Sequence, residues 1–336
     1  MGRHASVFGR LQSSWLLASV VVCVSGLALL GGCATESRGF AALRDVEYQT
    51  DDWTFQESAG TKITTKHYEI YTTLREPYLV NALPSAMESA YLFYRALVPA
   101  AAEPTEKMPV YLFATRGHFA HYTRQSFGLR AQLLLKVRGG GYSEKGKSVI
   151  EYVAHQIAFP VVAHEGMHQY IYHCVNKRIP AWLNEGLSVL CEGQRWDNRG
   201  LVEFDPYYNP LRRNALAEVL LRNKQFSLAD LLKSNAGHVV GGSSTEVDAF
   251  YGQVWALMLF LRDGEEGKYR DGLTRMLIAL GAEDIESFAQ AAHATSKREQ
   301  YEFGQALFAA FISDDLDGVG REFERFMKEK IIAKPD

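Results

Sequence analysis

Two short motifs near the middle of the chain could together bind a metal ion and activate a water molecule. His164, Glu165 and His168 form the pattern H-E-x-x-H, and Glu185 follows within the segment W-L-N-E-G. Residues four apart lie one above the other on a helix, so His164 and His168 can bind the same ion. Glu165 is rotated away from that ion but can reach a water molecule on it. Two imidazoles, one carboxylate, an open fourth position and a base are typical of a catalytic zinc site.

An ordinary helix that happens to carry two surface histidines is the competing interpretation of H-E-x-x-H. The second motif favours the zinc site, because it supplies a third ligand at a workable distance along the chain. We therefore expect Zn²⁺ to be held by His164, His168 and Glu185 alone among the protein groups.

The motifs H-E-G-M-H and W-L-N-E-G, joined by a short connection, resemble those of the gluzincin group of metallopeptidases. The second motif is similar to that of the aminopeptidases related to leukotriene A4 hydrolase. The resemblance implies that His164, His168 and Glu185 bind zinc and that Glu165 is the general base. It also implies a role for Glu192, which matches an acidic position of those enzymes and could orient a ligand histidine. A solvated glutamate at a helix end is the alternative for Glu192.

A tyrosine downstream of the third ligand stabilises the oxyanion in the same family. Tyr251 lies at a comparable distance after Glu185 and opens an apolar helical segment, so the resemblance implies this role for it. The alternative is an aromatic residue of the helical core, because the chain has 17 tyrosines.

One segment departs from the family pattern. Those aminopeptidases carry G-x-M-E-N before the zinc helix, and its glutamate holds the free amine of the substrate. The corresponding stretch here, residues 140–144, reads G-G-Y-S-E, so that glutamate is absent or displaced to Glu144. Aminopeptidase specificity is therefore not implied. A glycine-rich extended edge remains, along which a substrate backbone could pair as an added strand.

The first 33 residues have the pattern of an export signal. Arg3 and Arg10 precede an apolar run from Trp15 to Leu30, and no acidic residue occurs among them. The run ends in L-G-G-C, which resembles the lipobox of bacterial lipoproteins, in which the signal is cut before the cysteine and the cysteine is lipidated. The resemblance implies a protein anchored to the cell envelope through Cys33, at the outer membrane or the periplasmic face. An uncleaved amino-terminal anchor is the alternative.

Composition sets limits on the partners of the mature chain. Loss of Arg3 and Arg10 leaves 34 basic against 39 acidic residues, a net charge of −5. This balance favours neither nucleic-acid binding nor a polybasic membrane surface. Cys174 and Cys191 are predicted to be buried thiols, because antiparallel neighbouring helices would carry them apart in opposite directions.

The remaining patterns predict an α+β fold. Residues 34–52 read as a polar tether, and residues 53–195 as a small mixed sheet packed on the helical hairpin of the zinc site. Residues 196–336 are expected to be almost entirely helical and to complete the cleft, in the manner of gluzincins and thermolysin. Within this scheme residues 58–60 form a turn, residues 148–155 a strand, and Pro160 and Pro180 open the two site helices.

Several other polar residues are expected to be structural. His118, His121, His155 and His173 are predicted to be structural or surface residues, and Arg212-Arg213 to mark a solvated helix start. The sequence thus predicts an envelope-anchored zinc peptidase acting on a peptide or protein. Two alternatives remain: a non-catalytic lipoprotein that binds an envelope partner, and a zinc hydrolase of another amide or ester. The oligomeric state is not indicated.

Overall fold

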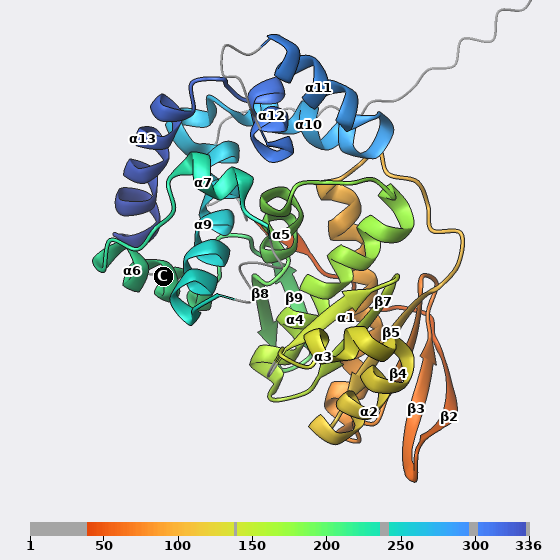
Figure 1. The fold of residues 1–336 in the computed structure, drawn as a ribbon. Coiled ribbons are helices and arrows are strands. Elements are labelled where there is room, and N and C mark those ends of the chain that lie inside the picture. Colours follow the sequence, from red (N-terminus) through yellow and green to blue (C-terminus); the bar gives the residue numbers. More distant parts are fainter. Residues whose placement is uncertain (1–38, 138–139, 236–241, 296–301, 334–336) are drawn as a thin grey trace, which may run out of the picture. The chain divides into compact units, whose positions relative to one another are not determined.

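A mixed six-stranded sheet occupies the first half of the chain in the computed structural model, which describes residues 39–137, 140–235, 242–295 and 302–333 (Figure 1). Its strand order is β2 (Gln49–Phe55), β3 (Ser58–Thr64), β4 (Tyr68–Thr72), β5 (Met108–Phe113), β7 (Lys147–Glu151) and β6 (Gly141–Glu144). Strands β4, β5 and β7 are parallel, whereas β2, β3 and β6 are antiparallel to their neighbours. Strand β6 therefore forms an edge of the sheet.

Helices cover both faces of this sheet because the side chains of its central strands alternate between two cores. Met108, Val110 and Leu112 of β5 join the main core with α1 (Pro77–Leu97) and α4 (His155–Tyr170). Phe113 joins a smaller core with residues of α2 (Arg116–Phe127) and α3 (Ala131–Leu134). Successive residues of a strand point to opposite faces, so one strand supplies both cores.

A second, three-stranded sheet joins the start of the described chain to its middle. Its order is β1 (Phe40–Ala41), β9 (Gly200–Phe204) and β8 (Gln194–Asp197), all antiparallel. The predicted tether at residues 34–52 is therefore wrong in part, because it includes β1 and the start of β2. The boundary expected between residues 195 and 196 falls inside β8. Both errors have one cause, because the polar and charged residues of exposed strands have the composition that is also typical of a linker.

Two further boundaries differ from expectation. Residues 58–60 lie within β3, and the turn is formed instead at Gln56, whose φ of 54° is left-handed. Helix α4 begins at His155, so this histidine is helical and Pro160 lies inside the helix. A proline ring removes one backbone hydrogen bond there, yet the buried side chains of α4 keep the helix in place. Helix α5 (Ala181–Leu190) begins directly after Pro180, as predicted.

The chain after β9 is helical in the described residues, which confirms the predicted α+β class. Its helices are α6 (Pro210–Leu221), α7 (Leu228–Lys233), α9 (Ser244–Asp263), α10 (Arg270–Ala282), α11 (Ile285–Thr295), α12 (Phe303–Phe311) and α13 (Leu316–Phe326). None of the described helices is long and apolar enough to cross a membrane. The predicted export signal and Cys33 lie outside the described residues.

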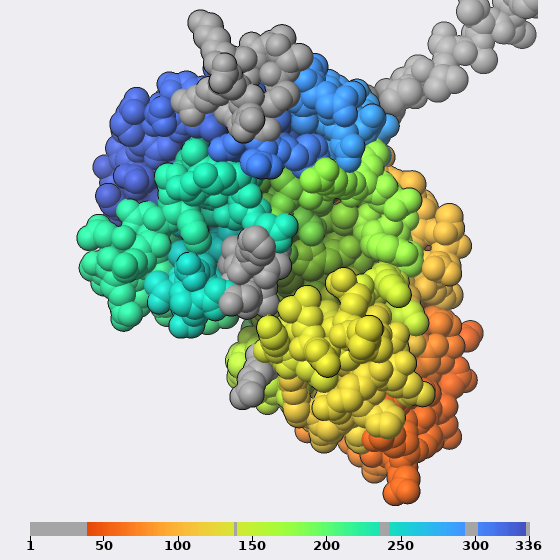
Figure 2. Space-filling view, viewed as in Figure 1, coloured from red at the N-terminus to blue at the C-terminus, as the bar shows by residue number. Residues whose placement is uncertain are grey.

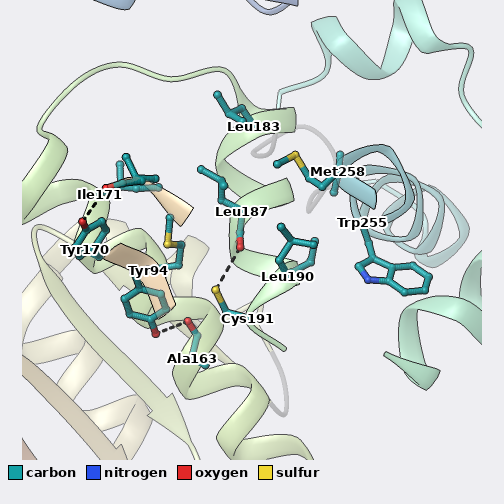
Figure 3. Close-up of a cluster of buried hydrophobic side chains, with 14 of the residues drawn as sticks. Tyr94, Ala163, Tyr170, Ile171, Leu183, Leu187, Leu190, Cys191, Trp255 and Met258 are labelled. Atoms are coloured by element: carbon teal, nitrogen blue, oxygen red, sulfur yellow. Dashed lines mark hydrogen bonds between the residues drawn. The ribbon is translucent and has the colours of Figure 1, made fainter. Parts of the chain in front are cut away.

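Helices α4 and α5 form a hairpin between the sheet and the helical part. Helix α4 continues into a π-helical turn, η2 (Ile171–Val175), which ends at Asn176 in the left-handed conformation. Helix α5 then packs against both α4 and α9, and Figure 3 shows Leu183, Leu187 and Leu190 of α5 in this core. In Figure 2 the green segment that contains the hairpin lies between the yellow segment of α2 and α3 and the teal segment of α7 and α9.

Both cysteines of the hairpin are buried and free, as predicted. Cys174 lies in the π-helical turn, and Cys191 follows the last residue of α5, where its thiol donates a hydrogen bond to the Leu187 carbonyl (Figure 3). Burial raises the pKa of Cys174 to about 12. This thiol therefore stays protonated and contributes to packing.

The contact between α5 and α9 generates a stability prediction. A Cβ added at Gly186 would lie 2.8 Å from Cγ of Met258, so Gly186→Ala should lower the free energy of unfolding by about 1–3 kcal/mol. Gly117→Ala on α2 is the matched control, because its nearest neighbour would be 3.8 Å away and alanine favours a helix. Urea unfolding measures both changes. Equal stability of the Gly186→Ala protein and its parent would contradict close packing of α5 on α9.

Candidate metal centre

The α4–α5 hairpin brings three predicted ligands to one point. Glu185 Oε2 lies 3.3 Å from Nε2 of His164 and 3.4 Å from Nε2 of His168. All three candidate ligand atoms lie within 4.8 Å of one another. The two histidines come from successive turns of α4, and the glutamate comes from the middle of α5. Among the described residues, this is the group of His, Cys, Asp and Glu side chains arranged to hold an ion.

The spacing of these atoms matches the edge of a small tetrahedron. Zinc bonds to nitrogen and carboxylate oxygen are about 2.0–2.2 Å long, and ligands at tetrahedral angles on such bonds are separated by about 3.3–3.6 Å. The two nitrogen–oxygen distances fall in or close to this range. A larger ion such as Ca²⁺ prefers six to eight oxygen ligands at about 2.3–2.6 Å, which this set does not supply.

A cation between the three side chains would also remove an electrostatic conflict. Glu185 Oε2 is buried and has no hydrogen-bond partner among the described residues. Its lone pairs face the Nε2 atoms of two imidazoles, each of which uses Nδ1 as its donor elsewhere. Such a juxtaposition is unfavourable unless a proton or a metal ion lies between the atoms. The donor set therefore fits a divalent zinc ion.

Glu192 holds the first histidine. Its Oε1 accepts a hydrogen bond of 2.8 Å from His164 Nδ1, which directs Nε2 of His164 toward Glu185. Arg212 donates two hydrogen bonds to the same carboxylate, at 2.8 and 2.7 Å, and Asn209 donates one at 3.0 Å. This bidentate pairing keeps the pKa of Glu192 well below its usual range despite burial. Glu192 is thus buried beside the site, not solvated at a helix end.

Asn184 holds the second histidine in the same way. Nδ1 of His168 donates a hydrogen bond of 3.0 Å to Asn184 Oδ1, and Ser188 Oγ lies 3.2 Å from the same nitrogen. Ser188 in turn donates to the Asn184 backbone carbonyl. Sequence reasoning missed both residues. Their positions in the sequence could have indicated these contacts. Asn184 directly precedes Glu185 in W-L-N-E-G, and Ser188 follows Asn184 by one helical turn.

Arg212 was also missed as a site residue. It was expected at a solvated helix start, but its side chain is largely buried, with its guanidinium 4.7 Å from the centre of the Tyr251 ring. The expectation failed because Arg212 pairs with Glu192, which lies after the end of α5 and 20 residues earlier in the sequence. The other histidines behave as predicted in the described residues, since none joins the ligand group. His118 contacts Ser58, for example, and His173 contacts the Gly146 carbonyl.

The charges around the ligands explain where protons lie without an ion. The three carboxylates of Glu165, Glu185 and Glu192 and the guanidinium of Arg212 give a net charge of −2 when the histidines are neutral. Burial lowers the pKa of His164, but the adjacent carboxylates of Glu185 and Glu192 outweigh it and raise the pKa to about 10. Burial also lowers the pKa of His168, and the Glu185 charge raises it overall. Protons thus replace the positive charge that a divalent ion would supply, and binding that ion releases them.

Glu165 lies beside the ligands and faces the edge strand of the sheet. It is 8% exposed, and no described residue donates a hydrogen bond to its carboxylate. Burial raises its pKa, against the opposing effect of the two histidines. A Cβ added at Gly141 of β6 would lie 3.0 Å from Cγ of Glu165. Glycine at this position therefore favours the close approach of the strand to Glu165.

Tyr251 is brought to the same site by α9. Its ring centre lies 6.1 Å from that of His164, and Arg212 packs on its face. Burial raises the pKa of Tyr251 well above its usual range, and the negative charge of Glu185 adds to the effect. The phenol is therefore a protonated donor. The ring thus lies beside the candidate ligand His164 and is partly buried against the main core.

Two cavities flank the ligand group along α4. One, of about 470 Å³, is lined by His168, Glu185 and the η2 turn. The other, of about 760 Å³, is lined by Pro160 and Val161, one turn before His164, and by Glu192 and Arg212. A chain-like ligand could therefore extend in both directions from the metal ligands.

Comparison with known proteins identifies a family model without a known activity. A model described as "Protein of unknown function (DUF1570)" matches residues 156–277, a range that contains both motifs, Glu192, Arg212 and Tyr251. No curated protein and no solved structure gives a significant match to the chain.

The hydrogen bond from His164 generates a prediction for metal affinity. Glu192→Gln keeps an oxygen acceptor but removes the charge that Arg212 and His164 share. Loss of such a partner typically lowers metal affinity about 10–100-fold, which zinc titration against a chromophoric chelator measures. Glu218→Gln on α6, whose carboxylate pairs with Arg222 at the surface, is the control. If zinc affinity is unchanged in a folded Glu192→Gln protein, Glu192 does not position His164.

Proposed function

We propose that the protein is a zinc-dependent peptidase that hydrolyses peptide bonds with Glu165 as its general base. The observation that supports this most directly is the convergence of His164, His168 and Glu185 beside a buried carboxylate that has no structural partner. A binding site for an ion needs the three ligands only. A carboxylate kept buried without a hydrogen-bond donor is unfavourable for folding, and such groups are typical of catalytic sites.

His164, His168 and Glu185 would hold the zinc ion, which would supply polarisation of the scissile carbonyl and acidification of the attacking water. Glu165 accepts the proton of that water at its carboxylate as the water oxygen bonds to the carbonyl carbon. The carboxyl group then delivers the proton to the amide nitrogen as the carbon–nitrogen bond breaks. Its raised pKa suits both steps, because a base with a pKa nearer neutrality binds and releases a proton readily.

Tyr251 completes the catalytic group by donating a hydrogen bond to the developing oxyanion. Its phenol remains protonated, and the contact with Arg212 fixes its ring. The positive charge of Arg212 lies on the face of the ring and is neutralised by Glu192. An oriented donor of this kind stabilises the transition state without reorganisation during the reaction.

An extended substrate is the ligand that best suits the surroundings of Glu165. Strand β6 is the edge of the six-stranded sheet, and Gly141 on this strand lies next to the base. A peptide that pairs with β6 as an added strand would pass over Glu165 with its backbone held by hydrogen bonds. A small ester or a compact amide would not use this edge, although the same catalytic groups could hydrolyse it.

We also propose that the peptidase acts in the cell envelope, anchored by a lipid on Cys33. This part of the proposal rests on the sequence of the first 33 residues alone. The alternative of a non-catalytic lipoprotein keeps the same location and removes the hydrolysis.

Replacement of the base tests the proposed reaction. Glu165→Gln should retain stoichiometric zinc but lower kcat by about 10²–10⁴-fold, because it removes only the proton acceptor. Cleavage of a peptide library followed by mass spectrometry, together with metal analysis of the same preparations, measures both quantities. The surface variant Glu218→Gln should behave as the parent. Equal turnover by the Glu165→Gln and parent proteins would remove Glu165 from the mechanism.

Replacement of the tyrosine tests the oxyanion donor separately. Tyr251→Phe keeps the ring that packs on Arg212 and removes only the hydroxyl group, so zinc content and stability should not change. The value of kcat should fall by about 10²–10³-fold, as expected when one preorganised donor is lost. Tyr48→Phe, at an exposed tyrosine, is the matched control. A Tyr251→Phe protein with parental kcat would assign oxyanion stabilisation to another group.

A further inference from the structure

The cavity beside His168 and Glu185 has a strongly basic lining. It has a volume of about 470 Å³, within the usual range for ligand sites. We call it the basic pocket, and its lining residues with polar or charged side chains outside the metal ligands are Ser143, Lys145, Tyr172, Asn176, Lys177, Arg178 and Asn184. The only acidic residue in the lining is Glu185, which the proposed zinc ion would neutralise.

Two turns with left-handed backbone place the cations of the basic pocket. Lys145 lies in the turn between β6 and β7, with a φ of 52°. Asn176 ends the η2 turn with a φ of 51°, and it directs the chain through Lys177 and Arg178 toward Pro180. The cations therefore come from two segments, one from the turn between β6 and β7 and two from the connection between the site helices.

None of these three cations forms an ion pair in the described part of the chain. Nζ of Lys177 donates one hydrogen bond to the Leu280 carbonyl, which leaves two donors. The guanidinium of Arg178 lies 5.0 Å from the centre of the Phe303 ring, a contact that leaves the nitrogen atoms at its edge available. The nearby Glu144 does not neutralise the pocket, because it pairs with Arg130 at 2.9 Å.

The second cavity is different in character. Its lining includes Ile157, Val161, Trp196 and Leu211, and Arg212 within it is already paired with Glu192. Of the two cavities, only the basic pocket is therefore lined by lysine or arginine side chains without an ion pair among the described residues, since Arg195 of the second cavity is also paired, with Asp205. This asymmetry would discriminate between substrates by the charge of the residues on that side.

The direction of β6 indicates which part of a substrate reaches the basic pocket. Gly141 lies beside Glu165, Ser143 lies farther along the strand, and Lys145 lies in the turn that follows it; both Ser143 and Lys145 line the pocket. A substrate paired antiparallel to β6 would place the residues before its scissile bond toward the carboxyl end of β6. Antiparallel pairing is the more stable arrangement per residue.

We propose that the basic pocket binds an Asp or Glu side chain of the substrate, one or two residues before the scissile bond. This inference rests on the proposed peptidase function. The pocket shares His168 and Glu185 with the metal centre, so its occupant lies within about two residues of the reacting carbonyl. The carboxylate would accept hydrogen bonds from the free donors of Lys177 and Arg178, with Lys145 at the mouth.

Matched fluorogenic peptides test the charge preference. Sets that differ only in Glu, Gln or Lys at the two positions before the cleaved bond should give kcat/KM in the order Glu, Gln, Lys. Exposed ion pairs are each worth about twofold to fivefold, so two or three of them predict about a tenfold advantage of Glu over Gln. This advantage should shrink between 0.1 and 1 M salt, where the screening length falls from about 10 to about 3 Å.

Charge-reversal variants locate the preference in the pocket. Lys145→Glu and Arg178→Glu should each reduce the preference for Glu peptides, and the double variant should favour Lys peptides. Lys147→Glu is the matched control, because Lys147 lies on the same hairpin but outside the lining. Fluorescence anisotropy measures the affinity of the same peptides for zinc-loaded Glu165→Gln protein. These affinities should decrease in the same order, Glu, Gln, Lys, although the variant does not cleave the peptides.

The outcomes separate this inference from the proposed function. Cleavage of Glu, Gln and Lys peptides at equal rates would overturn the basic pocket and leave the peptidase intact. A preference for Asp or Glu only at positions after the cleaved bond would also overturn the inference, because the pocket would then hold the part of the substrate that follows the scissile bond. Failure of the zinc-loaded protein to cleave any peptide would contradict the peptidase, and the inference would fall with it.

Discussion

The buried carboxylate of Glu192 connects the parts of the structure that must meet at the metal centre. Glu192 follows α5, accepts a hydrogen bond from His164 on α4, and is paired with Arg212 on α6, which packs on Tyr251 of α9. Four helices thus meet at one ionic group. A buried ion pair costs desolvation energy, which is offset only when its geometry is specific. Here each oxygen of Glu192 has at least two partners, so the helices have one arrangement that satisfies it.

Almost every residue of the W-L-N-E-G motif contacts either the candidate metal centre or the carboxy-terminal helices. Trp182 donates a hydrogen bond to the Gly304 carbonyl on α12, Asn184 orients His168, and Glu185 is a candidate ligand. Gly186 allows Met258 of α9 to approach. The helix that completes the site therefore has its remaining faces buried against the carboxy-terminal helices. For this reason residues 196–336 are part of the folding unit that holds the site, and a chain ending at residue 195 would expose the apolar faces of α5.

The sequence predicted the parts of the site that depend on local spacing. His164 and His168 are one helical turn apart, so any helix brings them together, and the second motif identified Glu185. Glu192 and Tyr251 required the resemblance to gluzincins, because nothing in their local sequence distinguishes them from other glutamates and tyrosines. Asn184, Ser188 and Arg212 were missed since their roles arise from contacts between helices. The α+β class followed from periodicity, whereas β1, β8 and β9 were missed because these strands are short and partly polar, and β1 pairs with β9 only across a long stretch of chain.

The distribution of charge around the site would link the proposed metal ion to the proposed choice of substrate. Glu165, Glu185 and Glu192 are buried, and their charges would be balanced by Arg212 and by the two positive charges of the proposed zinc ion. The cations of the basic pocket form no ion pair in the described part of the chain, and they lie in or directly after turns that contain a left-handed residue. A substrate carboxylate would therefore meet positive charge without displacing any internal ion pair, whereas a basic side chain would meet repulsion from Lys145, Lys177 and Arg178. Discrimination of this kind costs the fold little, because the unpaired cations remain partly solvated until a substrate binds.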